Sequence, residues 1–194
     1  MPAPAHHPTA VEAGTADIRP LMAGFPSGVS VLTALDEDAA PRGMTCSSLA
    51  SVALSPPTLV VCVRTASPTL DTILAGGQFA VNLLHEDARD ASQVFASGSD
   101  DRFERVEWRL PLGASGPHLT ADAHATADCE VVRTVEMGDH TAVFAGVRRV
   151  TLRENAAPPL LYGRRRYARW SDAAVSPDPP AQPIPTEGAA RVRP

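Results

Sequence analysis

Apolar and polar positions alternate with the two-residue period of β-strands over much of the chain. Between residues 28 and 36, for example, Val29, Val31, Thr33 and Leu35 fall on one predicted face. The same kind of analysis predicts strands over residues 28–36, 78–84, 127–135, 141–152 and 160–162. Residues 136–140 contain Gly138 and separate two of these strands, so the pattern predicts a β-hairpin with its turn there.

Residues 41–63, PRGMTCSSLASVALSPPTLVVCV, form the most informative stretch of the chain. From Thr45 to Leu54 we predict a single strand that is polar at its start and apolar at its end, stopped by two prolines. The following run, 58–63, is almost unbroken in apolar residues and predicts a strand buried on both faces, with Cys62 inside and inert. A polar strand start beside a buried strand suits a site at the mouth of a barrel, where hydroxyls and free N–H groups hold an anion.

Short helices are predicted between the strands, over residues 17–22, 70–74 and 87–96, with Gly76-Gly77 ending the second. Strands and short helices without a βαβ rhythm favour a mainly β fold, an antiparallel barrel. The sequence contains no G-x-G-x-x-G, so a dinucleotide would not be held on a Rossmann fold.

The termini differ in composition from the rest of the chain. Residues 1–15 are rich in Ala and Pro and 171–194 are rich in Pro, so we expect a disordered arm and tail around one domain at 16–170. The net charge of −5 argues against nucleic-acid binding. Three cysteines without a C-x-x-C pair, and no apolar run of membrane length, lead us to expect a cytoplasmic protein that does not enter a membrane. The histidines lack metal-ligand spacing, and we expect no metal site.

Several motifs, taken in order, make the chain resemble the flavin reductase-like family over residues 18–170. They are FPSGVSV at 25–31, GMTCSS at 43–48, SVALSPP at 51–57, QFAVNLL at 78–84, DRF at 101–103 and GDH at 138–140. Leu49 and Ala53 depart from the aromatic residue and the serine expected at those positions. The resemblance implies a dimeric, Greek-key split β-barrel with short inserted helices. It also implies a flavin, FMN or FAD, and a nicotinamide cofactor, NADH or NADPH.

The resemblance also assigns roles to individual residues. The backbone of 44–48 is expected along the flavin ring and the 67–69 segment at its phosphate, where a helix start favours an anion. Expected cofactor-binding residues are Met44, Thr45, Cys46, Ser47, Ser48, Cys62, Ser67, Thr69 and Asn82. The hydroxyls among them can instead cap and solvate a strand edge, and Cys46 is expected to make contact rather than act as a nucleophile.

Three features of the sequence keep two interpretations each. Asn82, a polar residue in an apolar strand, either pairs with loop backbone or faces the flavin. His140 is either the implied catalytic residue or a solvated turn histidine. As the catalytic residue it would hydrogen-bond the nicotinamide carboxamide or stabilise charge on reduced flavin. The arginines of 164–166 either attract a nucleotide phosphate or end a strand in solvent.

The function implied by the resemblance is NAD(P)H:flavin oxidoreduction, with reduced flavin supplied to a partner monooxygenase. Two rivals remain at this stage: a split-barrel enzyme that keeps its flavin and reduces another substrate, and a flavin-binding protein without turnover. The sequence does not choose between FMN and FAD or between NADH and NADPH.

Overall fold

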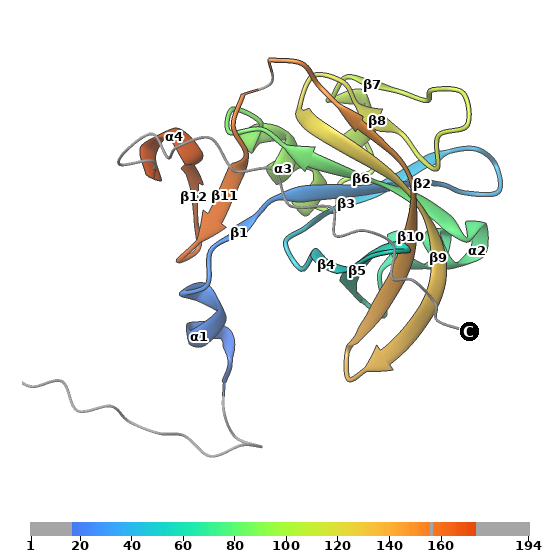
Figure 1. Ribbon diagram of the computed structural model, residues 1–194, viewed down its shortest axis with the longest axis horizontal. Helices are drawn as coiled ribbons and strands as arrows, with labels where there is room; N and C mark the ends of the chain where they lie inside the picture. The colour runs from blue at the N-terminus through green and yellow to red at the C-terminus, as the bar shows by residue number, and fades with distance from the viewer. Residues whose placement is uncertain (1–16, 156, 174–194) are drawn as a thin grey trace, which may run out of the picture.

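A computed structural model of the protein describes residues 17–155 and 157–173, and Figure 1 shows the arrangement of its elements. The expected arm at 1–15 and most of the expected tail at 171–194 lie outside the described residues. The helices are α1 (Arg19–Ala23), α2 (Pro68–Gly76), α3 (Arg89–Ala96), the 3-10 turn η1 (Arg102–Glu104) and α4 (Trp170–Ala173). The strands are β1 (Ser27–Gly28), β2 (Ser30–Leu35), β3 (Pro41–Cys46), β4 (Ala50–Leu54), β5 (Pro57–Arg64), β6 (Gln78–Leu84), β7 (Trp108–Arg109), β8 (His118–Leu119), β9 (Ala123–Met137), β10 (His140–Leu152), β11 (Leu160–Gly163) and β12 (Arg166–Arg169).

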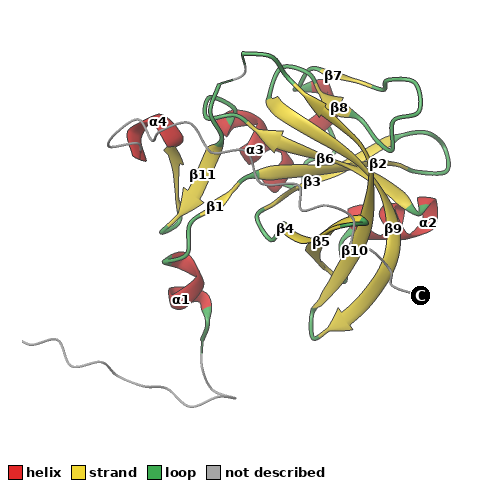
Figure 2. Ribbon diagram, viewed as in Figure 1, coloured by secondary structure: helices red, strands yellow, loops and turns green. Residues whose placement is uncertain are grey.

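A seven-stranded sheet dominates the molecule, in the order β3-β2-β6-β9-β10-β5-β4. All its pairings are antiparallel, and the sheet curls around a core, as the yellow strands of Figure 2 show. The chain segment 47–49 connects the two edge strands, β3 and β4, across the mouth of the curl. The mainly β, antiparallel architecture predicted from the sequence is therefore confirmed.

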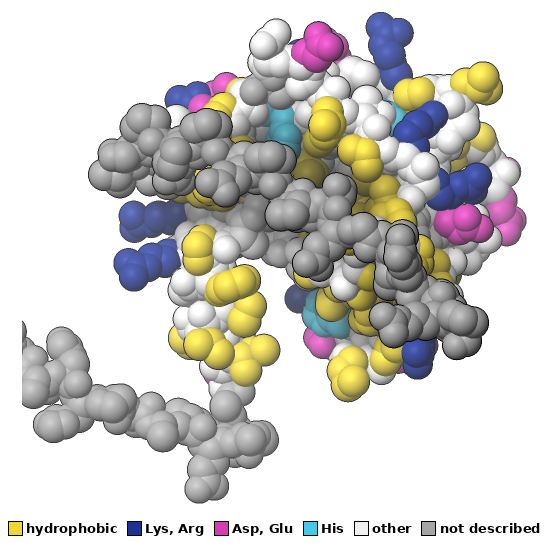
Figure 3. Space-filling model, in the orientation of Figure 1, with side chains coloured by type: hydrophobic (Ala, Val, Ile, Leu, Met, Phe, Trp, Pro, Cys, Tyr) yellow, Lys and Arg dark blue, Asp and Glu magenta, His cyan; other side chains and the backbone are white. Residues whose placement is uncertain are grey.

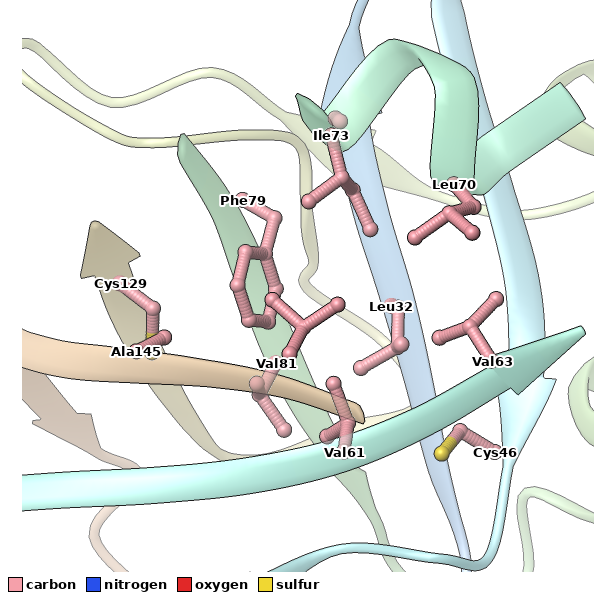
Figure 4. Packing of buried hydrophobic residues seen from close by; sticks show 12 residues of the cluster. Leu32, Cys46, Val61, Val63, Leu70, Ile73, Phe79, Val81, Cys129 and Ala145 are labelled. Carbon is pink, nitrogen blue, oxygen red and sulfur yellow. The ribbon is translucent and has the colours of Figure 1, made fainter. Parts of the chain in front are cut away.

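The barrel interior is filled by side chains from α2 and from strands β2, β3, β5, β6, β9 and β10. Leu70 and Ile73 of α2 are fully buried and close one end over Leu32, Phe79 and Val81 (Figure 4). Gly77 follows α2 with a φ of 65°, a left-handed conformation that glycine adopts without strain. The predicted helix and its glycine stop are thus both present.

A second core lies outside the sheet, between its outer face and α3. Val31, Leu84, Phe95, Leu119 and Leu160 are all buried there. Because Val31 faces this second core while its neighbour Leu32 faces the barrel interior, β2 is the strand buried on both faces. Its burial follows from its central place in the sheet and from the helix that covers it.

Two sequence predictions about residues 45–63 are wrong. The predicted single strand from Thr45 to Leu54 is two strands on opposite edges of the sheet, because the chain crosses the barrel mouth at 47–49. Strand β5 buries Val61 and Val63, but its other face is open and Cys62 is exposed. The apolar run could not reveal this, because burial of the second face depends on what covers the sheet, and α3 packs elsewhere.

The long hairpin is confirmed and its turn is tight. β9 and β10 pair from His140 opposite Met137 to Leu152 opposite Ala125, with two register shifts. Gly138 takes a φ of 62° in the turn. His140, which follows this turn, is therefore held at the start of a regular ladder rather than in a mobile loop.

A buried ionic cluster fastens the 110–119 loop to the barrel. Asp128 is 1% exposed and accepts hydrogen bonds from His118 Nε2 at 3.0 Å, from the Ser115 N–H at 2.6 Å and from Arg149 Nε at 2.8 Å. Burial by itself raises the pKa of the Asp128 carboxyl, but these three bonds outweigh burial and hold its pKa below the usual 3.8.

This cluster predicts a loss of stability in acid. A lowered folded-state pKa gives a stabilisation that is complete above the ordinary value of 3.8 and is lost as the pH falls through the folded-state pKa. We expect the free energy of unfolding, measured with urea, to fall as the pH is lowered from about 5 to below 3.8, and to fall less in Asp128→Asn. An identical acid dependence in the two proteins would contradict the assignment.

Candidate functional site

A groove lies between the barrel mouth and the arm formed by α1, β1, β11 and β12. Figure 1 shows this arm set apart from the barrel. The groove has a volume of about 580 Å³, within the usual range for small-molecule sites. Its lining residues come from α1 and the turn after it, the 47–50 segment and the β11–β12 turn: Arg19, Met22, Ala23, Phe25, Ser27, Ser47, Ser48, Leu49, Ala50, Tyr162, Gly163, Arg164 and Arg165.

Ser48 holds the barrel-mouth segment to β5. Its hydroxyl accepts a hydrogen bond from the Cys62 N–H at 2.9 Å and donates one to the Cys62 carbonyl at 2.8 Å. The Cys46 Sγ also lies 3.1 Å from this hydroxyl. Ser48 is therefore a positioning residue for the groove wall, whereas no hydrogen bond within the described residues engages the Ser47 hydroxyl.

The residues of β3 alternate between the barrel interior and α3. Met44 and Cys46 pack toward the interior core, and Thr45 donates from Oγ1 to the Ser92 carbonyl at 2.6 Å. Burial raises the pKa of the Cys46 thiol, which keeps it protonated and fits the expectation of contact rather than nucleophilic chemistry. Thr45 is only partly buried by this contact, and with Ser47 and Ser92 it lines a small cavity beside α3.

Ser67 lies at the position that precedes α2, as the sequence predicts. Its hydroxyl points to the Met44 Sδ at 3.5 Å rather than capping the helix. The structure therefore brings Ser67 to β3, next to the stretch expected along the flavin. Thr69 is 4% exposed and packs within the fold.

Asn82 is fully buried, and its amide is paired within the protein on all sides. Nδ2 reaches the carbonyls of Val31 and Pro117 and the Thr33 hydroxyl, and Oδ1 accepts from the Leu119 N–H at 2.9 Å. Of the two interpretations kept for Asn82, the geometry favours pairing with backbone.

The open face of β5 carries what we call the outer strip: Ala50, Val60, Cys62, Arg64 and His140. Ala50 pairs with Val60, and His140 pairs with Arg64, so paired side chains share a face. Residues 60, 62 and 64 lie on the same face of β5. The distance along the strand from Val60 to Arg64, a step of four residues, is about 13 Å. The outer strip therefore runs from the groove wall at Ala50 to the hairpin turn at His140.

His140 has a fixed partner at the far end of the strip. Its Nδ1 lies 2.8 Å from Asp139 Oδ1, and this hydrogen bond lowers the pKa of the Asp139 carboxyl. The bond leaves Nε2 as the ring nitrogen free to face a ligand. The histidine side chain is half-exposed, as a residue that meets a substrate must be.

Sequence reasoning missed the groove residues contributed by the two ends of the domain. Phe25 follows α1, and Tyr162 ends the predicted strand at 160–162; the two line the groove from segments far apart in sequence. The Tyr-Gly-Arg-Arg run at 162–165 was the one available signal, an aromatic residue and two cations together at a strand end.

Comparisons with known proteins agree with this arrangement. Residues 22–171 match the model of the family described as flavin reductase like domain. The flavin reductase (NADPH) of Lentzea aerocolonigenes is 49% identical over 156 residues, covering 80% of this chain and 90% of that protein.

Solved structures give the same result. The NADH:FAD oxidoreductase of Streptomyces globisporus, in complex with NAD and FAD fragments, superposes with a TM-score of 0.73 at 33% identity, covering 78% of this chain and 90% of that one. The styrene monooxygenase flavin reductase of Pseudomonas putida S12 superposes with a TM-score of 0.70 at 32% identity, covering 78% and 96%. Together with the fold and the groove beside its serine-rich strand, these matches show that the chain belongs to the flavin reductase-like domain family.

Proposed function

We propose that this protein is an NAD(P)H-dependent flavin reductase whose reaction takes place along the outer strip. The observation that carries the proposal is the continuity between the groove wall at Ser47 and the strip that ends at His140. Related proteins named as NADPH and NADH flavin reductases support the same activity. The activity makes the chain an oxidoreductase.

The residues present fit a flavin, FMN or FAD. The groove offers an apolar surface from Leu49 and Ala50 for a flat ring, and the free Ser47 hydroxyl for a ribityl chain. At the start of α2 the Thr69 N–H makes no backbone hydrogen bond within the described residues, so it and the helix dipole can receive a phosphate. When bound, the flavin accepts a hydride from the nicotinamide of NADH or NADPH, and the redox chemistry belongs to these two molecules.

The protein's own contribution is alignment. Ser48 fixes the groove wall through its two bonds to Cys62, so the ring is held without reorganisation. His140 presents Nε2 at the end of the strip, where it donates to the nicotinamide carboxamide or to charge that develops on the flavin. Both roles require only a hydrogen bond, and no protein nucleophile takes part.

Assays of NADH and NADPH oxidation, each with FMN, with FAD and without added flavin, test the function. We expect fast oxidation only with added flavin, and reduced flavin that a monooxygenase can use. Oxidation of a tightly held flavin by another substrate would instead make the protein a self-contained oxidoreductase. A yellow protein without turnover would make it a flavin carrier.

Ser47 should affect flavin binding before it affects the hydride step. We expect Ser47→Ala to weaken flavin binding by about threefold to tenfold, the loss of one hydrogen bond, and Ser47→Ala with Ser48→Ala to weaken it further. Fluorescence titration of flavin measures both affinities. Thr58→Ala, on the same sheet but outside the groove, is the control; an effect equal to that of Ser47→Ala would show a general loss of structure.

The partners that we propose are a second copy of this chain and a separate monooxygenase that receives reduced flavin. Two large apolar side chains of the α1 region that do not line the groove are more than half exposed: Ile18 and Leu21. Figure 3 shows a yellow, apolar surface over the projecting α1. A related flavin reductase is named for its styrene monooxygenase, which supports the second partner.

Dimerisation is expected to bury the apolar surface of α1. Light scattering at micromolar concentration should give twice the chain mass, and Leu21→Glu should shift the mass toward that of one chain, because a carboxylate cannot be buried there without cost. A monomeric wild-type protein that still binds flavin would contradict the dimer.

No helix within residues 17–155 and 157–173 has the length and apolarity needed to cross a membrane. Cys46, Cys62 and Cys129 are all free thiols. Free thiols are typical of a reducing compartment, so our proposed location is the cytoplasm.

A further inference from the structure

The turn between β11 and β12 has an unusual sequence for its backbone. Gly163 pairs with Arg166, so the loop is only Arg164 and Arg165, with φ values of 51° and 60°. Two-residue hairpin loops with positive φ at both positions strongly prefer Asn-Gly, because bulky side chains are strained there. Strain of this kind is kept where the side chains have a task.

The turn is held rigidly against the start of the domain. The Arg164 N–H donates to the Ala23 carbonyl at the end of α1. A Cβ at Gly163 would lie 3.1 Å from the Pro26 side chain, so this position admits only glycine without movement. The two arginines are therefore presented from a fixed backbone, and both line the 580 Å³ groove.

A third cation, Arg19 of α1, lines the groove together with Arg164 and Arg165. We call these three arginines the arginine rim. The Arg19 guanidinium pairs with Asp17 at 2.8 Å. The hydrogen bonds from Arg19 and, to a smaller extent, the charge of Arg165 lower the pKa of the Asp17 carboxyl. Within the described residues Arg164 and Arg165 make no ion pair within 4 Å.

The same groove offers flat apolar surfaces beside the cations. Tyr162 lines it and is fixed by its neighbour Tyr167, with ring centres 5.2 Å apart. Phe25 lines it from the opposite chain segment and is 67% exposed. Aromatic rings of this kind stack on a purine, and arginine forks match phosphate oxygens.

We propose that Arg164, Arg165 and Arg19 bind the phosphates of an adenine dinucleotide whose adenine lies against Tyr162 and Phe25. The inference rests on the proposed function, which places the reacting ring at the Ser47 end of the same groove. A dinucleotide joins a reacting ring to an adenosine through phosphates, so one molecule spans from the serines to the arginine rim. These phosphates are those of the nicotinamide dinucleotide, because the proposed function assigns the flavin phosphate to the start of α2, and the 2′-phosphate of NADPH is a further source of the same chemistry.

Binding of two adenosine probes by calorimetry tests the site without turnover. Adenosine 5′-diphosphate represents the diphosphate half of NADH and NADPH, and adenosine 2′,5′-bisphosphate carries the extra phosphate of NADPH. We expect Arg164→Asn with Arg165→Gly to weaken binding by about tenfold or more while the melting temperature stays equal or rises, since Asn-Gly suits the turn. Arg19→Gln gives a second, independent loss that leaves the turn intact.

The control is Arg166→Gln, which removes one charge from the same hairpin outside the groove and should change binding by less than about twofold. A loss confined to the bisphosphate assigns the rim to the 2′-phosphate, and an equal loss of both probes assigns it to the diphosphate. Wild-type binding in the double variant, or a loss no larger than in Arg166→Gln, would overturn the proposal. Flavin reduction by the wild-type protein is measured in a separate assay. If the arginine variants bind the adenosine probes like wild type, the proposed reductase activity can therefore still hold.

Discussion

Asn82→Ala is expected to lower the free energy of unfolding by about 3 kcal/mol, the largest effect on stability that we predict. The side chain is fully buried, and its amide joins three parts of the fold: β2, the segment that leads into β8, and β9. Its hydrogen-bond partners are Val31, Thr33, Pro117, Leu119 and Thr126. Alanine would leave the Leu119 N–H buried without its acceptor, while the Pro117 carbonyl keeps the bond from the Thr33 hydroxyl. A buried donor left unpaired costs more than a hydrogen bond contributes on average.

Urea unfolding measures the loss, and flavin titration of the folded protein tests the role. Because Asn82 pairs only with protein groups, we expect the remaining folded protein to bind flavin with unchanged affinity. Gln78→Ala, at an exposed position of the same strand, is the control and should change stability by less than about 0.5 kcal/mol. Normal stability together with weakened flavin binding in Asn82→Ala would show instead that the amide serves the cofactor.

His140→Ala is expected to slow flavin reduction by about tenfold to a hundredfold, equivalent to 1.4–2.8 kcal/mol of transition-state stabilisation. The ring is held by Asp139 through Nδ1 and stands at the end of the outer strip, opposite Arg64. Its removal takes away a donor to the nicotinamide or to charge on the flavin, while the groove around Ser47 is untouched. Flavin affinity should therefore change little.

Stopped-flow reduction by NADH or NADPH at saturating flavin separates the hydride step from binding. Met137→Ala is a matched control, since Met137 pairs with His140 across the hairpin and is 72% exposed. It should leave the reduction rate within about twofold of wild type. An equal loss in both variants would mean that the hairpin shape matters and not the imidazole; an unaltered rate in His140→Ala would make this a turn histidine.

Local signals predicted most elements of the fold. The helix at α2, its stop at Gly77, the β6 strand and the long hairpin all follow from capping residues and periodicity, which act over a few neighbouring residues. The ordered motifs at 43–48 and 138–140 also pointed to the flavin reductase-like family, which the comparisons confirm.

The contacts between distant segments could not be predicted in this way. Periodicity could not show that β3 and β4 lie on opposite edges of the sheet, or that α3 covers β2 and leaves Cys62 exposed on β5. For the arginines at 164–166 the sequence favoured a solvated strand end over a phosphate-binding role.

The sequence by itself determined the fold class, the positions of the serine-rich stretch and of His140, and the family. Only the tertiary structure decided that Asn82 is committed to the protein interior, that Ser48 supports the groove wall, and that Arg19 and Arg164 line one groove. The physical reason is that burial and pairing are properties of the surfaces that meet, and those surfaces come from segments that are separated in the sequence, by 14 residues for Ser48 and Cys62 and by more than a hundred for Arg19 and Arg164.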